Sequence, residues 1–436
     1  MAHQGQNNPA GPGNIQRFEI TSSKDSESKV DIGPGIQDFR YYESVLANQI
    51  TATAVVIETG NDESGASEGI LDSLPVRGGE STNFVIEDTR GEKIELEMFV
   101  NRIRDADSGT QQDMYFLDFV PEEHFNNNQY GVIKRYQGKI SDNVKTILSD
   151  VLQTENIAEI EETSEEYNFF GNSKKPYYVI TNLASKSIPA DKEPGTVAGF
   201  LFYMTRDGFY FKSIDSFFKK EKEPVKKLIY NNTGEIPQGF DSVILKYTIG
   251  SDNDMNLNLN IGTYKNNSTY FDFYKMEYKE VLFSIEEQEE TADTAGKDYI
   301  TANKQFFQEA TRTFTFLKDM GVNPKGTGDE QLENFKNEGE QKENYKVEQT
   351  QVQTVMRYNQ MFSVQTKVMI PGDFSIRAGD IIECTFPQIK SERAKETNEQ
   401  SGGKYMVANV CHYMTPTETY TSMDLVRDSF GKSGGF

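Results

Sequence analysis

The chain has 436 residues, too many for one ordinary domain, so its length predicts two to four packing units. Its 45 Lys and Arg against 68 Asp and Glu give a net charge of −23, which argues against a protein whose main task is clamping nucleic-acid phosphates or anionic lipid. Tyr (22) and Phe (29) supply much of a lean 36% hydrophobic content, a profile that suits β-rich proteins with polar surfaces.

The cysteine count and the N-terminal sequence indicate in which cellular compartment the protein is made. Cys384 and Cys411 are too few for a disulfide framework or a zinc site, which indicates synthesis where thiols stay reduced. The start MAHQGQNNPAGPGNIQRF lacks the basic and apolar regions of a signal peptide. The longest apolar run, near residues 197–204, is far shorter than the ~20 residues that span a bilayer. We expect a soluble, non-secreted protein without membrane insertion.

The first part of the chain predicts an arm followed by strands. Residues 1–37 are rich in Gly, Pro, Asn, Gln and Ser and are expected to form a flexible arm. Residues 38–130 are expected to form a first β-barrel or sandwich. The strands expected there are Thr51–Ile57, Asn83–Glu87, Lys93–Ile103 and Asp113–Val120. In KIELEMFVNRI the apolar residues recur at every second position, the period of a strand with one buried face.

Residues 131–220 predict a mixed α and β unit. Ser141 is expected to cap a helix that continues to Leu152, because apolar residues recur there at helical spacing. The segment KKPYYVITNLASKSIP predicts a strand followed by a short helix. AGFLFYMTRDGFYFKSID predicts a hairpin, because Asp207-Gly208 tolerates the positive φ of a primed turn.

The remainder predicts a second barrel with an insertion. Residues 221–285 and 351–436 are expected to form the barrel, with strands in VILKYTI, NLNLNIGTYKNNSTYFDFYKM, Tyr358–Ile370, Ile381–Phe386, Tyr405–His412 and Tyr420–Val426. Residues 286–350 are expected to be an acidic insertion or linker, with one helix in ANKQFFQEATRTFTFLKDM.

A short pattern occurs in both expected barrels. Arg77 to Glu80 and Arg377 to Asp380 each place Arg, one residue, Gly and an acid just before a strand. Gly is needed at many turns, so the pattern leaves open whether the barrels arose by duplication or the match is chance.

The sequence offers little that could carry catalysis. The three histidines are too dispersed for a metal-binding pair: His3 lies in the arm, His124 in a polar loop and His412 on an expected strand. Neighbours on a strand point to opposite faces, so Cys411 and His412 are unlike a nucleophile and base; we expect Cys411 inward and His412 at a rim.

The acidic groups are also more typical of structure than of chemistry. Glu161, Glu162, Glu165 and Glu166 favour a solvated face, because clustered like charges repel. Asp252 and Asp254 lack the Gly and distal Glu of an EF-hand loop and indicate a turn. We therefore predict no catalytic, cofactor-binding or metal-binding residues, no cofactor and no enzyme activity.

A family resemblance emerges in the C-terminal sequence. FSIRAGDIIECTFPQ, followed by SGGKYMVANVCHYMTPTETYTSMDLVRDSFG, resembles the closing domain of baseplate hub proteins of contractile-tailed (T4-like) bacteriophages. The matching positions are Gly379, Asp380, Pro387, Ser401, Tyr405, Val407, His412, Arg427, Asp428 and Ser429, with an extra Gly402-Gly403. YYESVLANQITATAVVIETG with LPVRGGE resembles the family's first barrel, and the middle region resembles its second domain.

This resemblance implies a mainly β, multidomain fold with two tube-like β-barrel domains and a mixed α/β domain. It also implies a homotrimer in the virion tail baseplate that joins the tail tube to the central spike and passes DNA through its bore. The implied partners are the tail tube protein, the spike or spike-lysozyme protein, baseplate wedge proteins and the tape-measure protein. Such a late structural protein would assemble in the host cytoplasm.

Two other functions stay open at this point. One is the hub part of a spike in a type VI-like or other contractile injection system, against which the lack of a repetitive needle after residue 430 counts. The other is a tail-associated cell-wall glycosidase, against which the lack of a credible catalytic carboxylate pair counts.

Overall fold

The structure is a computed structural model of the chain. It describes residues 10–431 apart from residues 25–26, 59–75, 109–111, 165, 193–196, 220–221, 231–241, 251–253, 273–275, 290–291, 297, 300–304, 306–307, 320–343, 345, 388–397 and 399–400. The described part is mostly β, as the sequence predicts.

The first half of the fold is an antiparallel sheet with the strand order β3-β4-β7-β6-β5-β1-β2. Its elements are β1 (Asn14–Thr21), β2 (Lys29–Asp31), the 3₁₀ turn η1 (Gly33–Gly35), β3 (Ile36–Ser44), β4 (Thr51–Glu58), β5 (Ser81–Glu87), β6 (Lys93–Ser108) and β7 (Asp113–Val120). The four strands predicted here are confirmed. Ile94, Met98 and Val100 of β6 are buried on one face, as their period of two requires.

The flexible arm predicted for residues 1–37 is wrong for its later part. Strand β1 pairs with β5 over most of its length, and Phe18 and Ile20 are fully buried in the core. Two apolar side chains in a polar segment are easily overlooked in the sequence. Their burial offsets the conformational entropy lost when the segment becomes ordered. Residues 1–9 lie outside the described residues.

The second half repeats this arrangement. Its elements are β13 (Lys226–Tyr230), β14 (Val243–Ile244), β15 (Lys246–Gly250), β20 (Val364–Pro371), β21 (Ile381–Thr385), β22 (Gly403–Met414), β23 (Thr419–Arg427) and β24 (Ser429–Phe430). The strands predicted near 381, 405 and 420 are confirmed.

The strand orders of the two halves correspond one to one. The first runs β3-β4-β7-β6-β5-β1 and the second β15-β20-β23-β22-β21-β13, with β13 parallel to its neighbour where β1 is antiparallel. Both carry a bulge at the same place, between Val100 and Arg102 in β6 and between Val407 and Asn409 in β22. Bulges are local, designed features of a sheet, so their coincidence indicates a duplicated unit. Strand β22 pairs with β3 and joins the halves into one sheet.

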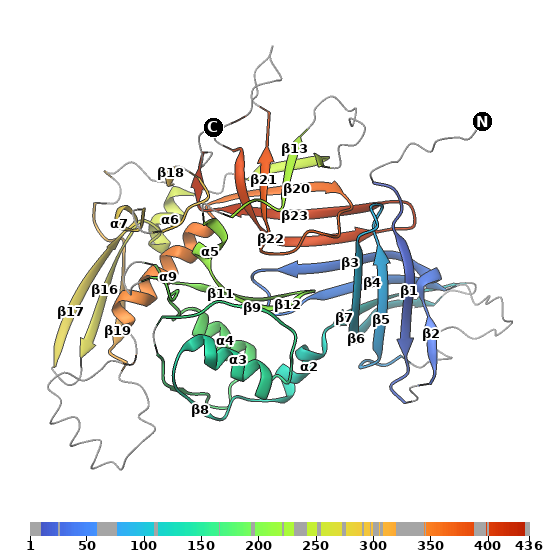
Figure 1. Cartoon of the computed structure of the whole chain (residues 1–436), viewed down its shortest axis with the longest axis horizontal. Helices are drawn as coiled ribbons and strands as arrows, with labels where there is room; N and C mark the ends of the chain where they lie inside the picture. The colour runs from blue at the N-terminus through green and yellow to red at the C-terminus, as the bar shows by residue number, and fades with distance from the viewer. Residues whose placement is uncertain are drawn as a thin grey trace.

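The middle unit lies below this sheet in Figure 1. Its elements are α2 (Glu122–Gln129), β8 (Arg135–Tyr136), α3 (Ile140–Asp150), β9 (Ile157–Ile160), β10 (Phe169–Phe170), α4 (Pro176–Ala184), β11 (Phe200–Thr205), β12 (Gly208–Ser213) and α5 (Ile214–Phe218). Helix α3 buries Val144, Ile147 and Leu148, which confirms the predicted apolar face.

Three local predictions for the middle unit need correction. The N-cap of α3 is Lys139, and Ser141 lies inside the first turn. Residues 176–184 are wholly helical, with no preceding strand, because Pro176 suits a first helical turn. The hairpin β11–β12 is confirmed, but the positive φ falls on Gly208 alone, at 121°, so the turn is not a primed one.

A lateral unit lies at the left of Figure 1. It contains α6 (Met255–Ile261), β16 (Lys265–Asp272), β17 (Glu277–Ser284), α7 (Ile285–Glu289), β18 (Asp298–Tyr299), β19 (Arg312–Leu317) and α9 (Val347–Met361). Here β16 lies between β17 and β19, and α9 packs on this sheet through Val352 and Met356.

The lateral unit overturns several predictions. Residues 255–261, expected as a strand, form α6, because the Asp254 carboxylate accepts a hydrogen bond from the Leu257 N–H at the helix start. The helix expected within 302–320 is instead strand β19, which pairs with β16. The strand expected from Tyr358 begins at Val364, after α9. The described parts of 286–350 supply β18 and β19 rather than a linker alone; residues 320–343 lie outside the described residues.

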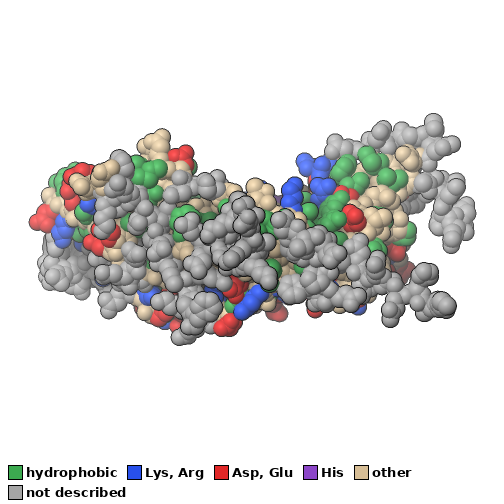
Figure 2. All heavy atoms as spheres, turned by 90° about the horizontal axis from the view of Figure 1, so that it is seen from above, with side chains coloured by type: hydrophobic (Ala, Val, Ile, Leu, Met, Phe, Trp, Pro, Cys, Tyr) green, Lys and Arg blue, Asp and Glu red, His purple; other side chains and the backbone are tan. Residues whose placement is uncertain are grey.

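Figure 2 shows the molecule from above as an elongated body, on which the visible basic side chains lie in small groups among acidic ones. None of the helices in the described part of the chain has the length and apolar character that crossing a bilayer would need.

Candidate functional site: the junction of the two halves

Glu43 is a buried carboxylate where the parts of the fold meet. Its Oε1 accepts hydrogen bonds from the Tyr41 hydroxyl (2.8 Å) and the Arg206 backbone N–H (2.9 Å), and its Oε2 accepts one from the Ala378 N–H (2.9 Å). Burial raises the pKa of Glu43, while these donors oppose the rise. The donors come from the first half, the middle unit and the second half, so one side chain ties all three together.

A second set of contacts crosses the same junction. The Asp88 carboxylate, in the β5–β6 turn, accepts a hydrogen bond from the Phe374 N–H at 2.8 Å. Asp373, which is 1% exposed, pairs with Arg90 at 2.7 Å and also with Lys226. A buried carboxylate with two cationic partners is strongly fixed in place. The loop at residues 373–380 is therefore held by both halves.

His412 lies inside this junction rather than at a rim. It is 1% exposed, its Nδ1 lies 3.1 Å from Thr421 Oγ1, and its Nε2 lies 3.0 Å from the Ile376 carbonyl. The Tyr41 ring stacks parallel to it. The prediction that Cys411 points inward and His412 outward is thus wrong, because both ring nitrogens find partners only inside. The strand alternation itself is confirmed, with Cys411 half-buried on the other face.

The buried His412 makes stability depend on pH. Burial, reinforced by the charge of Arg206, lowers its pKa to about 3. The unfolded chain takes up a proton there near pH 6.5 and the folded chain does not, so folding stability is full above that pH and falls as the pH drops toward 3. We expect this group to remove about 1.4 kcal/mol of unfolding free energy per pH unit below pH ~6.

Chemical denaturation of the wild type and a His412→Gln variant at pH 7, 6, 5 and 4 tests this. The variant has no titrating ring, so its unfolding free energy should decline less steeply with falling pH, whatever its stability at pH 7. Equal slopes in the two proteins would contradict the prediction.

The turn at Gly379-Asp380 is repeated in the first half. The Arg377 N–H donates to Asp380 Oδ2 (2.8 Å), the Gly379 N–H donates to the Val407 carbonyl (2.8 Å), and the Val407 N–H donates to the Asp380 carbonyl (2.8 Å). In the first half the same three bonds join Arg77, Gly79, Glu80 and Val100, at 2.9, 2.6 and 2.9 Å. The short sequence pattern is therefore a shared structural device, not a chance match.

Asp428 and Ser429 of the terminal Arg-Asp-Ser motif anchor the lateral unit, while Arg427 fixes the loop that enters β22. The Arg427 guanidinium lies 4.5 Å from the centre of the Tyr405 ring and donates to the Gly402 carbonyl. Asp428 accepts hydrogen bonds from Arg357 Nη1 (2.6 Å) and from the Ala295 N–H (3.0 Å). Ser429 Oγ accepts one from the Gly296 N–H at 2.6 Å, beside the β18–β24 pair. These residues hold structure together and contact no open site.

The other residues of the resemblance lie around the same sheet. The Tyr405 hydroxyl donates to the Ser401 carbonyl at 2.5 Å and closes the loop that enters β22. Pro387 lies two residues after the end of β21, and residues 388–397 after it lie outside the described residues. The structure thus brings Gly379, Asp380, Val407 and His412 into the junction, while Arg427, Asp428 and Ser429 lie on the lateral side.

The residues considered and rejected from sequence also have structural roles. Glu161 is not a solvated charge, because it accepts hydrogen bonds from the Ser213 N–H (2.7 Å) and hydroxyl (2.8 Å). His124 lies in helix α2 rather than in a loop, beside Gln49. Burial raises the pKa of Cys384, and it raises that of Cys411 to about 11, so neither thiol is activated. His3 and Asp252 lie outside the described residues.

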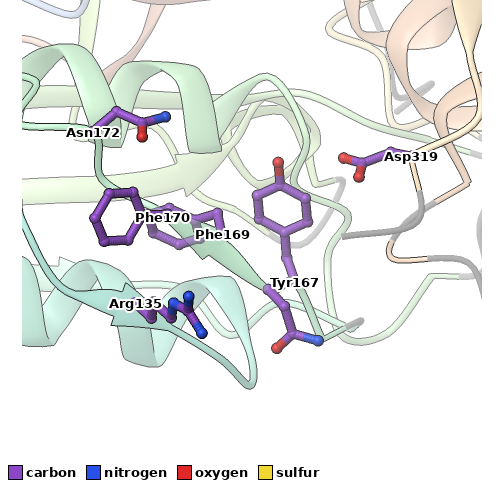
Figure 3. A pocket seen from close by; sticks show the side chains of 7 residues that line it. Arg135, Tyr167, Phe169, Phe170, Asn172 and Asp319 are labelled. Carbon is purple, nitrogen blue, oxygen red and sulfur yellow. The ribbon is translucent and has the colours of Figure 1, made fainter. Parts of the chain in front are cut away.

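A shallow pocket of about 490 Å³ opens on the middle unit. Figure 3 shows its lining: Arg135, Tyr167, Asn168, Phe169, Phe170, Asn172 and Asp319. Phe169 stacks between Tyr136 and Tyr167, at ring distances of 5.0 and 5.5 Å. Sequence reasoning missed this pocket; the only signal was the aromatic run at 167–170. Across the described residues, no three His, Cys, Asp or Glu side chains are grouped to share a metal ion.

Comparison with known proteins bears on the fold. No protein-family model matches the sequence, and no curated protein matches it in a sequence search. Solved structures do match: the tail protein from Neisseria meningitidis MC58 (TM-score 0.54, 10% identity, 94% of this chain and 96% of that chain) and the 43 kDa tail protein of prophage MuSo2 from Shewanella oneidensis (0.51, 8%, 95% and 98%). The chain has the fold of these tail proteins, which confirms, for the fold, the resemblance seen in the sequence.

Proposed function

We propose that the chain is the trimeric hub of a contractile tail baseplate, where it joins the tail tube to the central spike. The observation that carries this proposal is the duplication of strand order, bulge and turn between the two halves. Three copies present six equivalent units around a threefold axis, which suits an adaptor between a sixfold tube and a threefold spike. The fold shared with tail proteins supports the same role.

The units then have distinct tasks in this proposal. The two halves form the ring: the first tube-like domain consists of residues 14–120, and the second consists of residues 222–250 and 364–430. The middle and lateral units flank the joined sheet (Figure 1) and would meet the wedge proteins, while the ends of the ring would meet the tube, tape-measure and spike or spike-lysozyme proteins. Every buried contact of the junction is structural, which supports a role without catalysis.

The charge of the chain supports passage of DNA through the ring. A net charge of −23 gives protein and phosphate the same sign, which disfavours adsorption of DNA on the wall of a bore. A reconstructed ring with a bore lined mainly by Lys and Arg would contradict this part of the proposal.

The mass of the purified chain in solution tests the proposal. Native mass spectrometry or light scattering at micromolar concentration should give three times the chain mass of 49.5 kDa. A monomer that persists at tens of micromolar would overturn the hub function.

A further inference from the structure

Strand β22 shows how one half of the fold attaches to the other. One of its edges pairs with β23 over Met406–Met414. Its other edge pairs first with β21, over Gly403–Met406, and then with β3, over Asn409–Met414. Because β3 belongs to the first half, this second segment is the joint between the duplicated units.

Strand β6 is the counterpart of β22, and its corresponding edge has no strand on it. The pairing of β6 with β5 covers Lys93–Phe99 and stops beside the β6 bulge. The pairing of β22 with β21 stops beside the equivalent bulge in β22. Beyond the bulge β7 continues to pair with β6 as far as Ser108. Among the described residues, no strand pairs with the opposite edge of that segment.

Strand β15 is the counterpart of β3, and it is also an edge strand. It pairs with β20 on one side, and within the described residues no strand pairs with its other side. The antiparallel run β15-β20-β23-β22-β3-β4-β7-β6 therefore ends in the two strands that would make a second joint of the same kind. They lie at opposite ends of the run and cannot meet within one chain. Unpaired edges of this kind are templates for another chain.

We propose that the β6 edge of one copy pairs antiparallel with β15 of the next copy, in the register that β22 makes with β3. The proposed ring is assumed here, and the joint supplies its contact between copies. Such a contact is head-to-tail, so its repetition closes a ring where the rotation from one copy to the next completes a circle. The partner is a second copy of this chain because the chain already contains one such joint between equivalent strands.

The register follows from the duplication. Arg104 pairs with Phe116 as Cys411 pairs with Ser422, two residues past the bulge in each half. Gly250 occupies the place of Tyr42. Thr248 pairs with Lys367, which pairs in turn with Asp424, and Arg40 pairs with Thr53, which pairs in turn with Asp118. Gly250 and Tyr42 each lie two residues beyond these matching positions. Cys411 pairs directly with Tyr42 within the chain. Arg104 of one copy should therefore lie opposite Gly250 of the next.

Disulfide trapping tests this register. In a Cys411→Ser background, the Arg104→Cys and Gly250→Cys changes together should give disulfide-linked oligomers on a non-reducing gel, since directly opposed strand residues lie within bridging distance. The single variants should not. Arg104→Cys with Ile249→Cys is the matched control, because neighbouring residues on a strand face opposite ways. Tyr42→Cys beside the native Cys411 calibrates the method, as it should close a disulfide inside one chain.

The outcomes separate this inference from the proposed function. Cross-linking of the Arg104–Gly250 pair alone, in a protein of trimer mass, supports both. A trimer in which Tyr42→Cys closes its disulfide while the Arg104–Gly250 pair stays unlinked overturns the joint and leaves the hub function intact. A monomer overturns the hub function. Cross-linking of the Arg104–Gly250 pair in a ring with another number of copies would support the joint and overturn the trimer.

Hydrogen exchange on the unmodified chain provides a measure that needs no variant. The amides of 102–104 and 246–250 should be as protected in the assembled protein as those of 409–414. Fast exchange at both edges in the oligomer would overturn the joint.

Discussion

Replacing Arg357 with methionine is expected to lower the free energy of unfolding by about 3 to 5 kcal/mol, because it breaks a buried cluster of ion pairs. Arg357 is 1% exposed, and it donates from Nε to Asp215 (2.8 Å) and from Nη1 to Asp428 (2.6 Å). Its Nη2 donates to the Asp293 carbonyl at 2.7 Å. The variant leaves two buried carboxylates without their cation, and water cannot replace it.

A matched change at the surface separates burial from charge. Arg102 also pairs with an aspartate, Asp118 at 3.1 Å, but its side chain is 64% exposed. Arg102→Met should cost no more than about 1 kcal/mol, because exposed ion pairs are well screened. Urea denaturation of both variants provides the measurement. Equal losses would show that the buried cluster around Arg357 is not the anchor of α9 that its contacts indicate.

Apolar residues at every second position predicted a strand correctly where that strand has one buried face. The alternation in β6 was predictable, because its side chains sort between core and solvent on a period of two. The hairpin β11–β12 was predictable from the Asp207-Gly208 turn between two apolar runs, since β11 is buried along its whole length. The same logic failed for NLNLN, where alternation of Leu and Asn suits a strand, yet the Asp254 cap and the left-handed Gly262 (φ 75°) bound a helix. The caps at both ends of α6 outweighed the weak alternation of Leu and Asn in its sequence.

The junction could be predicted only in part. The residues of the resemblance singled out Gly379, Asp380 and His412, and all three lie in it. Glu43 and Asp88 were not predicted, because their partners in the other units lie 163 to 335 residues away and leave no local pattern. The face chosen for His412 was wrong for the same reason: its partner Ile376 comes from a loop whose position depends on the folded whole.

The repeated turn allows one glycine to be tested against another. Gly379 has a φ of 88°, and a Cβ added there would lie 2.4 Å from the Tyr203 hydroxyl oxygen and 3.2 Å from the Phe217 ring. Gly79 has nearly the same φ, 90°, but nothing lies within 4 Å of its added Cβ. Gly379→Ala should therefore cost the conformational strain of about 1–2 kcal/mol together with a steric cost of similar or larger size, whereas Gly79→Ala should cost the strain alone.

Thermal and urea unfolding of the two alanine variants measures that difference. Adding Tyr203→Phe to Gly379→Ala removes the oxygen nearest the new methyl group, so the double variant should regain part of the lost stability, beyond the sum of the single changes. Similar losses in both glycine variants would mean that conformation alone selects glycine in this turn, and that Tyr203 yields to the methyl group. A larger loss at Gly379 would instead show how the duplicated turns diverged: the first remained open to solvent, while the second was packed against β11 and fixed the middle unit to the sheet.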